Sequence, residues 1–196
     1  MTSHASAGAL RQVAVTDLPP LAYAHGDNHD PALTHPDHLR PVVNSDIGAS
    51  AKPHGGLWTA PIAEAGPDGT VLRTAWTDWY RDNEYGTDDY AHFLWIRPRP
   101  DARVLLIDTL DDLRAIVAAY PAVPARPALD FLRNKYPDWP ALAAAGWDAV
   151  FLTDDGQWAT RLPLYREPEL YTWDCATVLW LRPAYTVDQL VEAVAR

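Results

Sequence analysis

The chain has 196 residues, 48% of them hydrophobic, and a formal net charge of -10. This length and apolar content predict one folded domain, while the negative charge disfavours stable binding to nucleic acid or to an anionic membrane surface. The single cysteine excludes an internal disulfide, and the lack of a secretion signal or of an apolar run of ~18 residues predicts a cytoplasmic protein.

The N-terminal part of the chain predicts a flexible arm, a short strand and a long loop. We expect 1–17 to form the arm and 18–196 to fold as a single domain. A short strand is expected over 21–24 and ends at a His-Gly pair. The prolines and polar residues of 27–50 favour an irregular connection, which in a compact domain is usually functional or mobile.

A glycine pair that leads into an aromatic strand is the feature on which our functional prediction depends. Gly55 and Gly56 let the backbone turn or approach a ligand closely. A short strand that carries Trp58 is expected over 57–59, and Pro61 should end it. The pattern indicates either an aromatic edge that faces a ligand or a plain hairpin with a buried tryptophan.

The next segment predicts a helix with an aromatic face, followed by a strand. Trp76, Trp79 and Tyr80 stand at spacings i, i+3 and i+4 within 71–86, which places them on one side of a helix. A strand is expected over 90–96.

The middle of the chain predicts a buried strand and three helices. The strand is expected over 103–107. Thr109 and Asp112 form a capping-box pair at the start of the first helix. Two shorter helices are expected over 128–136 and 140–145, the second of them closed by a glycine.

The C-terminal part predicts a hairpin, a long strand and a final helix. A strand over 147–152 should turn at the Asp-Gly pair 155–156 and return over 157–164. A long strand is expected over 170–181, and a closing helix should begin at Thr186. Short strands mixed with helices, with few strand-helix-strand units, predict an α+β fold.

Reactive side chains gather at two places in the sequence. His25 and His29, with His35 and His38 further along, offer a metal hydrolase as a remote alternative, although Gly26 disfavours the helix that a chelating pair would need. Cys175 is expected to be a small core residue because no histidine lies beside it in sequence.

The second place is an acidic segment near the C-terminus. Glu169 and Asp174 would point to opposite faces of the expected strand, so one of them alone can face a given ligand.

The chain has no P-loop, no Gly-x-Gly-x-x-Gly turn and no Gly-x-Ser-x-Gly elbow, which disfavours ATPases, Rossmann dehydrogenases and α/β-hydrolases.

Taken in order, five segments resemble landmarks of the ADP-ribosyltransferases, the NAD-consuming fold of poly- and mono-ADP-ribosylating enzymes. They are a strand ending in His-Gly, a Gly-aliphatic-aromatic strand, an aromatic helix, a Gly-aromatic-Asp-Ala-Val segment and a strand led by an acid. They stand at Tyr23-Ala24-His25-Gly26-Asp27, Gly56-Leu57-Trp58-Thr59-Ala60, Trp76 with Trp79 and Tyr80, Gly146-Trp147-Asp148-Ala149-Val150, and 169–178. Asp27 departs from the Ser or Thr that is usual there. The chain also resembles small actinobacterial and phage proteins with Lys-Pro-x-Gly-Leu-Trp and Trp-Asp-Cys-Ala motifs, which leaves toxin, defence and counter-defence roles open.

The resemblance implies a split antiparallel β-sheet core, NAD as co-substrate and no metal. The activity implied is mono-ADP-ribosyl transfer to an unknown acceptor, whether protein, nucleic acid or small molecule, or hydrolysis of NAD by water. Glu169 would be the catalytic acid, with Asp174 as the alternative and His25 beside it. The nicotinamide would lie between Trp58 and one aromatic ring of the helix. The NAD-binding residues that it implies are His25, Gly26, Gly56, Leu57, Trp58, Thr59, Trp76, Trp79 and Tyr80.

A function of another class stays open on the same sequence. The net charge of -10 and the acidic Asp27 also suit a catalytically inactive binding or inhibitor module that masks a basic protein partner.

Overall fold

The computed structural model describes residues 9–27, 29–45, 52–85, 90, 92–124, 132, 134–164 and 167–188. The strands over these residues are β1 (Gln12–Val13), β2 (Leu21–His25), β3 (Leu57–Ala65), β4 (Val71–Thr74), β5 (His92–Pro98), β6 (Val104–Ile107), β7 (Ala149–Leu152), β8 (Thr177–Trp180) and β9 (Tyr185–Asp188). The α-helices are α1 (Ala75–Asp82), α2 (Leu110–Ala119), α3 (Trp139–Ala144) and α4 (Asp154–Arg161). Short 3-10 turns are η1 (Val15–Asp17), η2 (Pro31–Leu33) and η3 (Pro36–His38).

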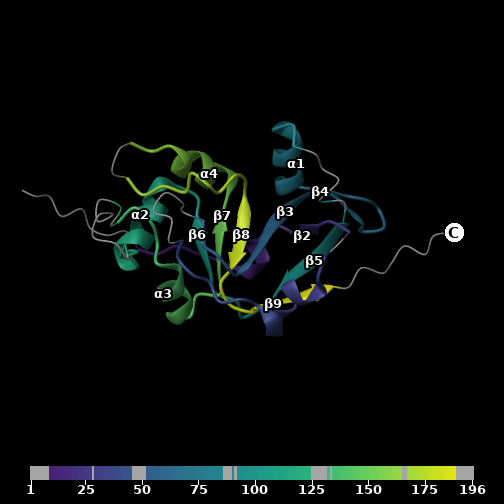
Figure 1. The fold of residues 1–196 in the computed structure, drawn as a ribbon, viewed down its shortest axis with the longest axis horizontal. Helices are drawn as coiled ribbons and strands as arrows, with labels where there is room; N and C mark the ends of the chain where they lie inside the picture. The colour runs from purple at the N-terminus through teal and green to yellow at the C-terminus, as the bar shows by residue number, and fades with distance from the viewer. Residues whose placement is uncertain are drawn as a thin grey trace, which may run out of the picture.

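The described strands form one sheet in the order β1-β6-β7-β8-β3-β2-β5-β9, and β4 pairs with β3 outside this path. The β6–β7 pair is parallel and the other pairs are antiparallel. In Figure 1, α2, α3 and α4 gather around the β6–β7–β8 half, whereas α1 stands at the other half above β3 and β4. The predicted α+β class with a mostly antiparallel sheet is therefore confirmed. No helix over the described residues is long and apolar enough to span a membrane.

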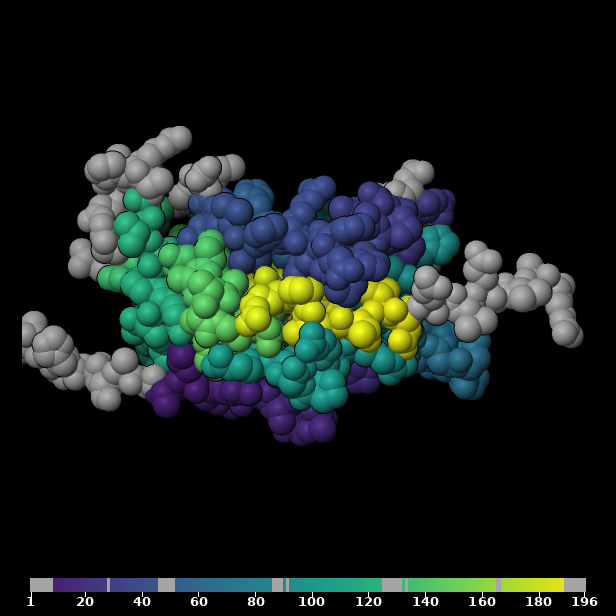
Figure 2. Space-filling view, turned by 90° about the horizontal axis from the view of Figure 1, so that it is seen from below, coloured from purple at the N-terminus to yellow at the C-terminus, as the bar shows by residue number. Residues whose placement is uncertain are grey.

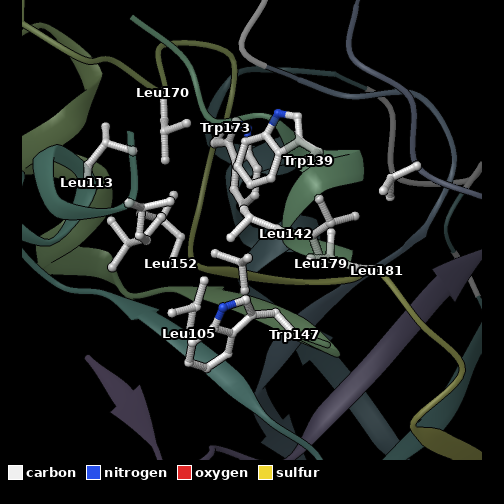
Figure 3. Packing of buried hydrophobic residues seen from close by; sticks show 14 of the residues in the cluster. Leu105, Leu113, Trp139, Leu142, Trp147, Leu152, Leu170, Trp173, Leu179 and Leu181 are labelled. Atoms are coloured by element: carbon white, nitrogen blue, oxygen red, sulfur yellow. The ribbon is translucent and has the colours of Figure 1, made fainter. Parts of the chain in front are cut away.

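Uninterrupted apolar sequence explains the central strands. All four residues of β7 and all four of β8 are buried, which is the pattern of strands covered on both faces. Trp139 and Trp173 pack in the core beside them (Figure 3). The ring centroid of Trp173 lies 5.2 Å from that of Trp139 and 4.6 Å from that of Trp58. Trp173 is fully buried, so it fixes the position of Trp58.

The prediction of a flexible N-terminal arm is wrong for residues 9–17, because β1 within this segment pairs with the sheet. β1 pairs with β6, and the Arg11 guanidinium donates a 2.9 Å hydrogen bond to the buried carboxylate of Asp112. The same carboxylate accepts from the Thr109 hydroxyl and from the backbone N–H groups of Asp108 and Thr109. The predicted capping box at Thr109 is confirmed, and its acid also anchors the N-terminal segment.

Asp112→Ala is expected to lower the free energy of unfolding by about 2–3 kcal/mol, because it removes a helix cap and leaves several buried donors unsatisfied. Urea denaturation measures the loss. Asp111→Ala is the matched control, since Asp111 lies in the same first turn with a side chain that is 82% exposed. An Asp112 variant no less stable than the Asp111 variant would contradict this account.

The expected hairpin at 155–156 is wrong, because this segment is the start of α4. Thr153 caps the helix by accepting a 3.0 Å hydrogen bond from the Gly156 N–H. A Cβ on Gly156 would lie 2.1 Å from the carbonyl oxygen of Ile107. The glycine therefore serves the close approach of a helix to β6 rather than a turn.

Two strand boundaries differ from expectation in the sheet. Pro61 does not end β3 but lies within it, opposite Leu21 of β2. It is tolerated there because β8 pairs with β3 at 57–59 and leaves that side of Pro61 without a strand partner. The long strand over 170–181 is also wrong, because strand structure begins at Thr177.

The short aromatic helix expected within 71–86 is α1, which follows β4 and begins at Ala75. The closing helix from Thr186 is instead strand β9, which pairs with β5. The helix over 128–136 lies largely outside the described residues. The strands over 21–24, 90–96, 103–107 and 147–152 correspond to β2, β5, β6 and β7.

Candidate functional site

A cavity of about 300 Å³ opens where β2, β3 and the residues before β8 meet the start of α1. These elements are adjacent because β3 pairs with β2 on one side and with β8 on the other. Five aromatic side chains line the cavity together with Asp174, namely Tyr23, Trp58, Trp76, Tyr90 and Trp173. Segments more than 100 residues apart in sequence therefore build one site.

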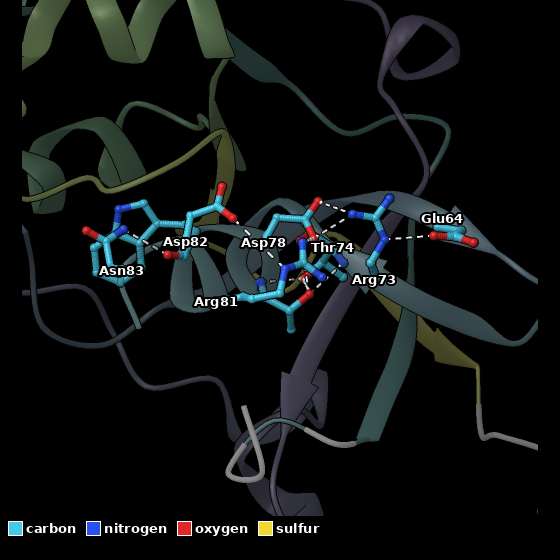
Figure 4. Close-up of polar contacts among 9 residues, drawn as sticks. Glu64, Arg73, Thr74, Asp78, Arg81, Asp82 and Asn83 are labelled. Atoms are coloured by element: carbon cyan, nitrogen blue, oxygen red, sulfur yellow. Dashed lines mark hydrogen bonds and ion pairs between the residues drawn. The ribbon is translucent and has the colours of Figure 1, made fainter. Parts of the chain in front are cut away.

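An ion-pair network holds α1 and Trp76 at the cavity. Arg73 in β4 binds Glu64 of β3 through a 2.7 Å contact and Asp78 of α1 through a 2.9 Å contact (Figure 4). A reciprocal capping box between Thr74 and Thr77 begins the helix. The rings of Trp79 and Tyr80 pack beside Trp76 in an aromatic cluster on α1.

A cation lies between two tryptophan rings in this cavity. The Lys52 ammonium is 4.9 Å from the ring centroid of Trp58 and 5.4 Å from that of Trp76. Indole faces attract cations through their quadrupole, so the two rings form a slot that suits a positive group. The Lys52 Nζ atom also lies 3.7 Å from a carboxylate oxygen of Asp174.

Asp174 is the acid that faces the cavity. Its side chain is 24% exposed. Burial raises the pKa of Asp174, and the charges of Lys52 and Arg161 oppose this rise. Burial also raises the pKa of the neighbouring Cys175 thiol to about 12, so the thiol is protonated at neutral pH and is a poor nucleophile.

Asp174→Asn is expected to melt at a temperature equal to or above that of the wild type at pH 7.5. A carboxyl whose pKa is raised by folding binds its proton more tightly in the folded state. The protonated carboxyl therefore adds to the free energy of unfolding at low pH, and this contribution is lost as pH rises through the folded pKa. The difference in melting temperature between the variant and the wild type should vanish towards pH 4. Thermal unfolding across this pH range measures it, with Asp82→Asn, an exposed acid, as control. A clear loss of stability at pH 7.5 would contradict the argument.

The structure places Glu169 outside the cavity lining. Its carboxylate accepts a 3.0 Å hydrogen bond from the Tyr136 hydroxyl and lies 3.3 Å from Lys135 Nζ. The strand register that would have aimed Glu169 at Trp58 does not exist, because 167–176 is irregular. Desolvation and the Glu169 charge together raise the pKa of Tyr136, which keeps this phenol protonated.

His25 lies at the end of β2 but does not line the cavity. Its Nδ1 atom is 2.8 Å from the Gly26 carbonyl oxygen, and its ring lies 4.2 Å from that of His29 and 5.5 Å from that of His92. Burial and the His25 charge lower the pKa of His29. Asp27, which stands where Ser or Thr is usual in the family, contacts His92 Nε2 through its carboxylate at 2.7 Å.

The other predicted residues divide between the cavity and the framework. Trp58, Trp76 and Thr59 line the cavity, whereas Trp79 and Tyr80 pack on α1 outside its lining. The Thr59 hydroxyl donates to the Val178 carbonyl and accepts from Trp180, so it joins β3 to β8. Two of the remaining residues are structural: Gly56 has a φ of +64° and Leu57 is a buried core residue.

The cavity residues that sequence reasoning missed include Lys52, Tyr90 and Trp173. Lys52 is one of two lysines in the chain and stands in the motif that also holds Trp58. Trp173 precedes the acid in the second motif. Within the described part of the chain, no group of three or more His, Cys, Asp and Glu side chains is placed to hold a metal ion.

Comparisons of the chain with protein-family models, with curated proteins and with solved structures find no match.

Proposed function

We propose that the protein cleaves the nicotinamide-ribose bond of NAD in this cavity, as a mono-ADP-ribosyltransferase or an NAD glycohydrolase, and that Asp174 rather than Glu169 is its essential acid. The observation that carries the proposal is the Lys52 cation, which contacts the rings of Trp58 and Trp76 as well as the Asp174 carboxylate. The oxidised nicotinamide ring is planar and positively charged, so it matches the slot that Lys52 fills in the free protein. Ring stacking and charge then favour the same position.

The proposal also assigns the sheet to the split antiparallel core of the ADP-ribosyltransferases. The three strands with the expected landmarks are neighbours in the order β8-β3-β2. Asp174 comes three residues before β8, beside the strand that holds Trp58. A cavity of about 300 Å³ is at the lower end of small-molecule sites, so it would enclose the nicotinamide end of the dinucleotide.

The chemistry follows from the placement of charge. As the bond between the nicotinamide nitrogen and the ribose anomeric carbon breaks, the electron pair leaves with neutral nicotinamide and positive charge develops on the ribose. The ionised Asp174 carboxylate would stabilise that charge and accept a hydrogen bond from a ribose hydroxyl. Water or another acceptor then bonds to the anomeric carbon and loses a proton. The walls of Trp58, Trp76 and Trp173 limit access of bulk water.

The test is incubation of the protein with NAD labelled in the nicotinamide ring, with chromatography of the products. Released nicotinamide at a rate above the protein-free control, and a rise of the melting temperature with NAD, are the expected results. If millimolar NAD gives no nicotinamide release and no shift of the melting temperature, the proposal is excluded. A shift without release would limit it to binding.

The binding module is a second candidate, and the same slot favours it. A pair of indoles and a carboxylate that hold the ammonium of Lys52 could hold a lysine of a basic partner instead. In that case Trp58→Ala abolishes the capture of one stoichiometric basic protein, and NAD has no effect on the melting temperature.

A further inference from the structure

A second cavity of about 290 Å³ lies at the opposite end of β8 from the first. Thr177, the first residue of β8, lines the first cavity, whereas Arg182 to Ala184, just beyond its last residue, line the second. The segments before β6 and β7 complete it. In Figure 2 the yellow C-terminal segment meets the green and teal segments on this face.

Three arginines line this cavity: Arg99, Arg103 and Arg182. Two acids accompany them, Asp101 beside Arg99 at 3.1 Å and Asp148 beside Arg182 at 3.4 Å. The local charge is therefore positive in a chain whose net charge is -10.

Arg103 is the arginine whose charge is not matched. Its guanidinium lies over the Trp147 ring, 4.3 Å from the centroid, and donates 3.3 Å hydrogen bonds to the carbonyl oxygens of Ala145 and Gly146. Among the described residues it forms no ion pair, since Asp148 accepts from the Arg103 backbone N–H and pairs with Arg182. A guanidinium presents its remaining N–H donors in a rigid planar fork.

A glycine leaves the space between two of these guanidiniums open. Gly146 has a φ of +87°, and a Cβ at this position would lie 3.0 Å from Arg103 Nη1 and 3.5 Å from Arg182 Nη1. Both nitrogens thus approach one point from which a side chain is missing. Two guanidiniums near one point create a positive potential there that favours an anion.

We infer that this arginine cavity binds a compact phosphate-containing small molecule, with Arg103 as its principal ligand. Tetrahedral oxygens accept hydrogen bonds from several guanidinium forks at once, which a single carboxylate cannot do as fully. A volume of about 290 Å³ suits a phosphate or pyrophosphate group with a small substituent. The site is separate from the Lys52–Asp174 cavity, so its occupancy does not depend on NAD cleavage.

Isothermal titration at fixed ionic strength, with inorganic phosphate, pyrophosphate and ribose 5-phosphate as probes, tests the inference and separates free phosphate from its esters. At least one probe should bind. Arg103→Gln should weaken its binding at least tenfold, as should Arg99→Gln, which guards against a folding defect in the first variant. Arg81→Gln, an arginine on α1 that pairs with Asp78, is the matched control and should change binding less than twofold.

Three results would overturn the inference. The first is no binding of any probe at tens of millimolar, and the second is equal binding by the Arg103 and Arg81 variants. The third is binding that NAD displaces and that the arginine variants leave unchanged, which would place the probe in the first cavity. A single-stranded oligonucleotide that binds where all three probes fail would assign the arginines to nucleic acid and also refute a small-molecule site.

Discussion

Asp174→Asn is expected to lower the rate of nicotinamide release from NAD by about two to three orders of magnitude, which is the usual effect of removing a preorganised stabiliser of transition-state charge. The amide keeps the shape and much of the hydrogen bonding of the carboxylate but lacks its charge. The affinity for NAD, read from the thermal shift, should change far less than the rate. Single-turnover product analysis at saturating NAD measures the effect.

Glu169→Gln is the matched control, because it makes the same chemical change at the acid outside the cavity lining. Its rate should stay within about threefold of the wild type. If the Glu169 variant is inactive and the Asp174 variant is active, the assignment of the acid is wrong, even though NAD cleavage itself would stand.

The acid limb of the pH-rate profile follows from the same residue. The proposed catalysis needs ionised Asp174, and burial raises the pKa of this carboxyl. The rate should therefore fall at a higher pH than an ordinary aspartate, with a pKa of ~3.9, would give. In the Asp174→Asn variant, the residual rate should no longer fall on the acid side of the pH-rate profile.

Trp173→Ala is expected to lower the free energy of unfolding by about 3–5 kcal/mol, the range for a large aromatic lost from a core. Trp173 is fully buried in the core cluster of Figure 3, and its ring contacts those of Trp58 and Trp139. Its loss leaves a cavity next to the site, and Trp58 loses its lateral support. Urea denaturation followed by far-UV circular dichroism measures the change.

Trp158→Ala is the comparison for that variant. Trp158 lies on α4, and 74% of its surface is exposed. Its substitution should change the free energy of unfolding by less than about 0.5 kcal/mol. Equal losses of the free energy of unfolding in the two variants would contradict the placement of Trp173 in the core.

Local chemistry made part of the fold predictable. The pair Thr109 and Asp112 specifies a helix start by hydrogen bonds within four residues, so sequence alone could identify it. Gly156 could not be assigned in this way. An Asp-Gly pair suits both a hairpin turn and a helix that must approach a strand closely, and the carbonyl of Ile107 that decides between them is 49 positions away.

Two aromatic residues of the site were predictable, whereas its acid and its other aromatic residues were not. Trp58 and Trp76 stand in recognisable local patterns, and both line the cavity. The choice between Glu169 and Asp174 depended on whether 170–181 is a strand, and alternation within a segment does not show where its strand pairing begins. Lys52 was missed because its position depends on two rings that only the folded chain brings together.

The place of β8 in the sheet has a consequence for biosynthesis. This strand joins the β6–β7 half to the β3–β2–β5–β9 half, yet it comes from residues 177–180 and pairs with β3 across about 120 positions of sequence. The strands on its two sides, β7 and β3, cannot be joined through β8 until that segment has been synthesised, and closing so long a loop slows folding. The cavity forms at the same junction, so the proposed activity would be absent from every nascent chain that lacks β8.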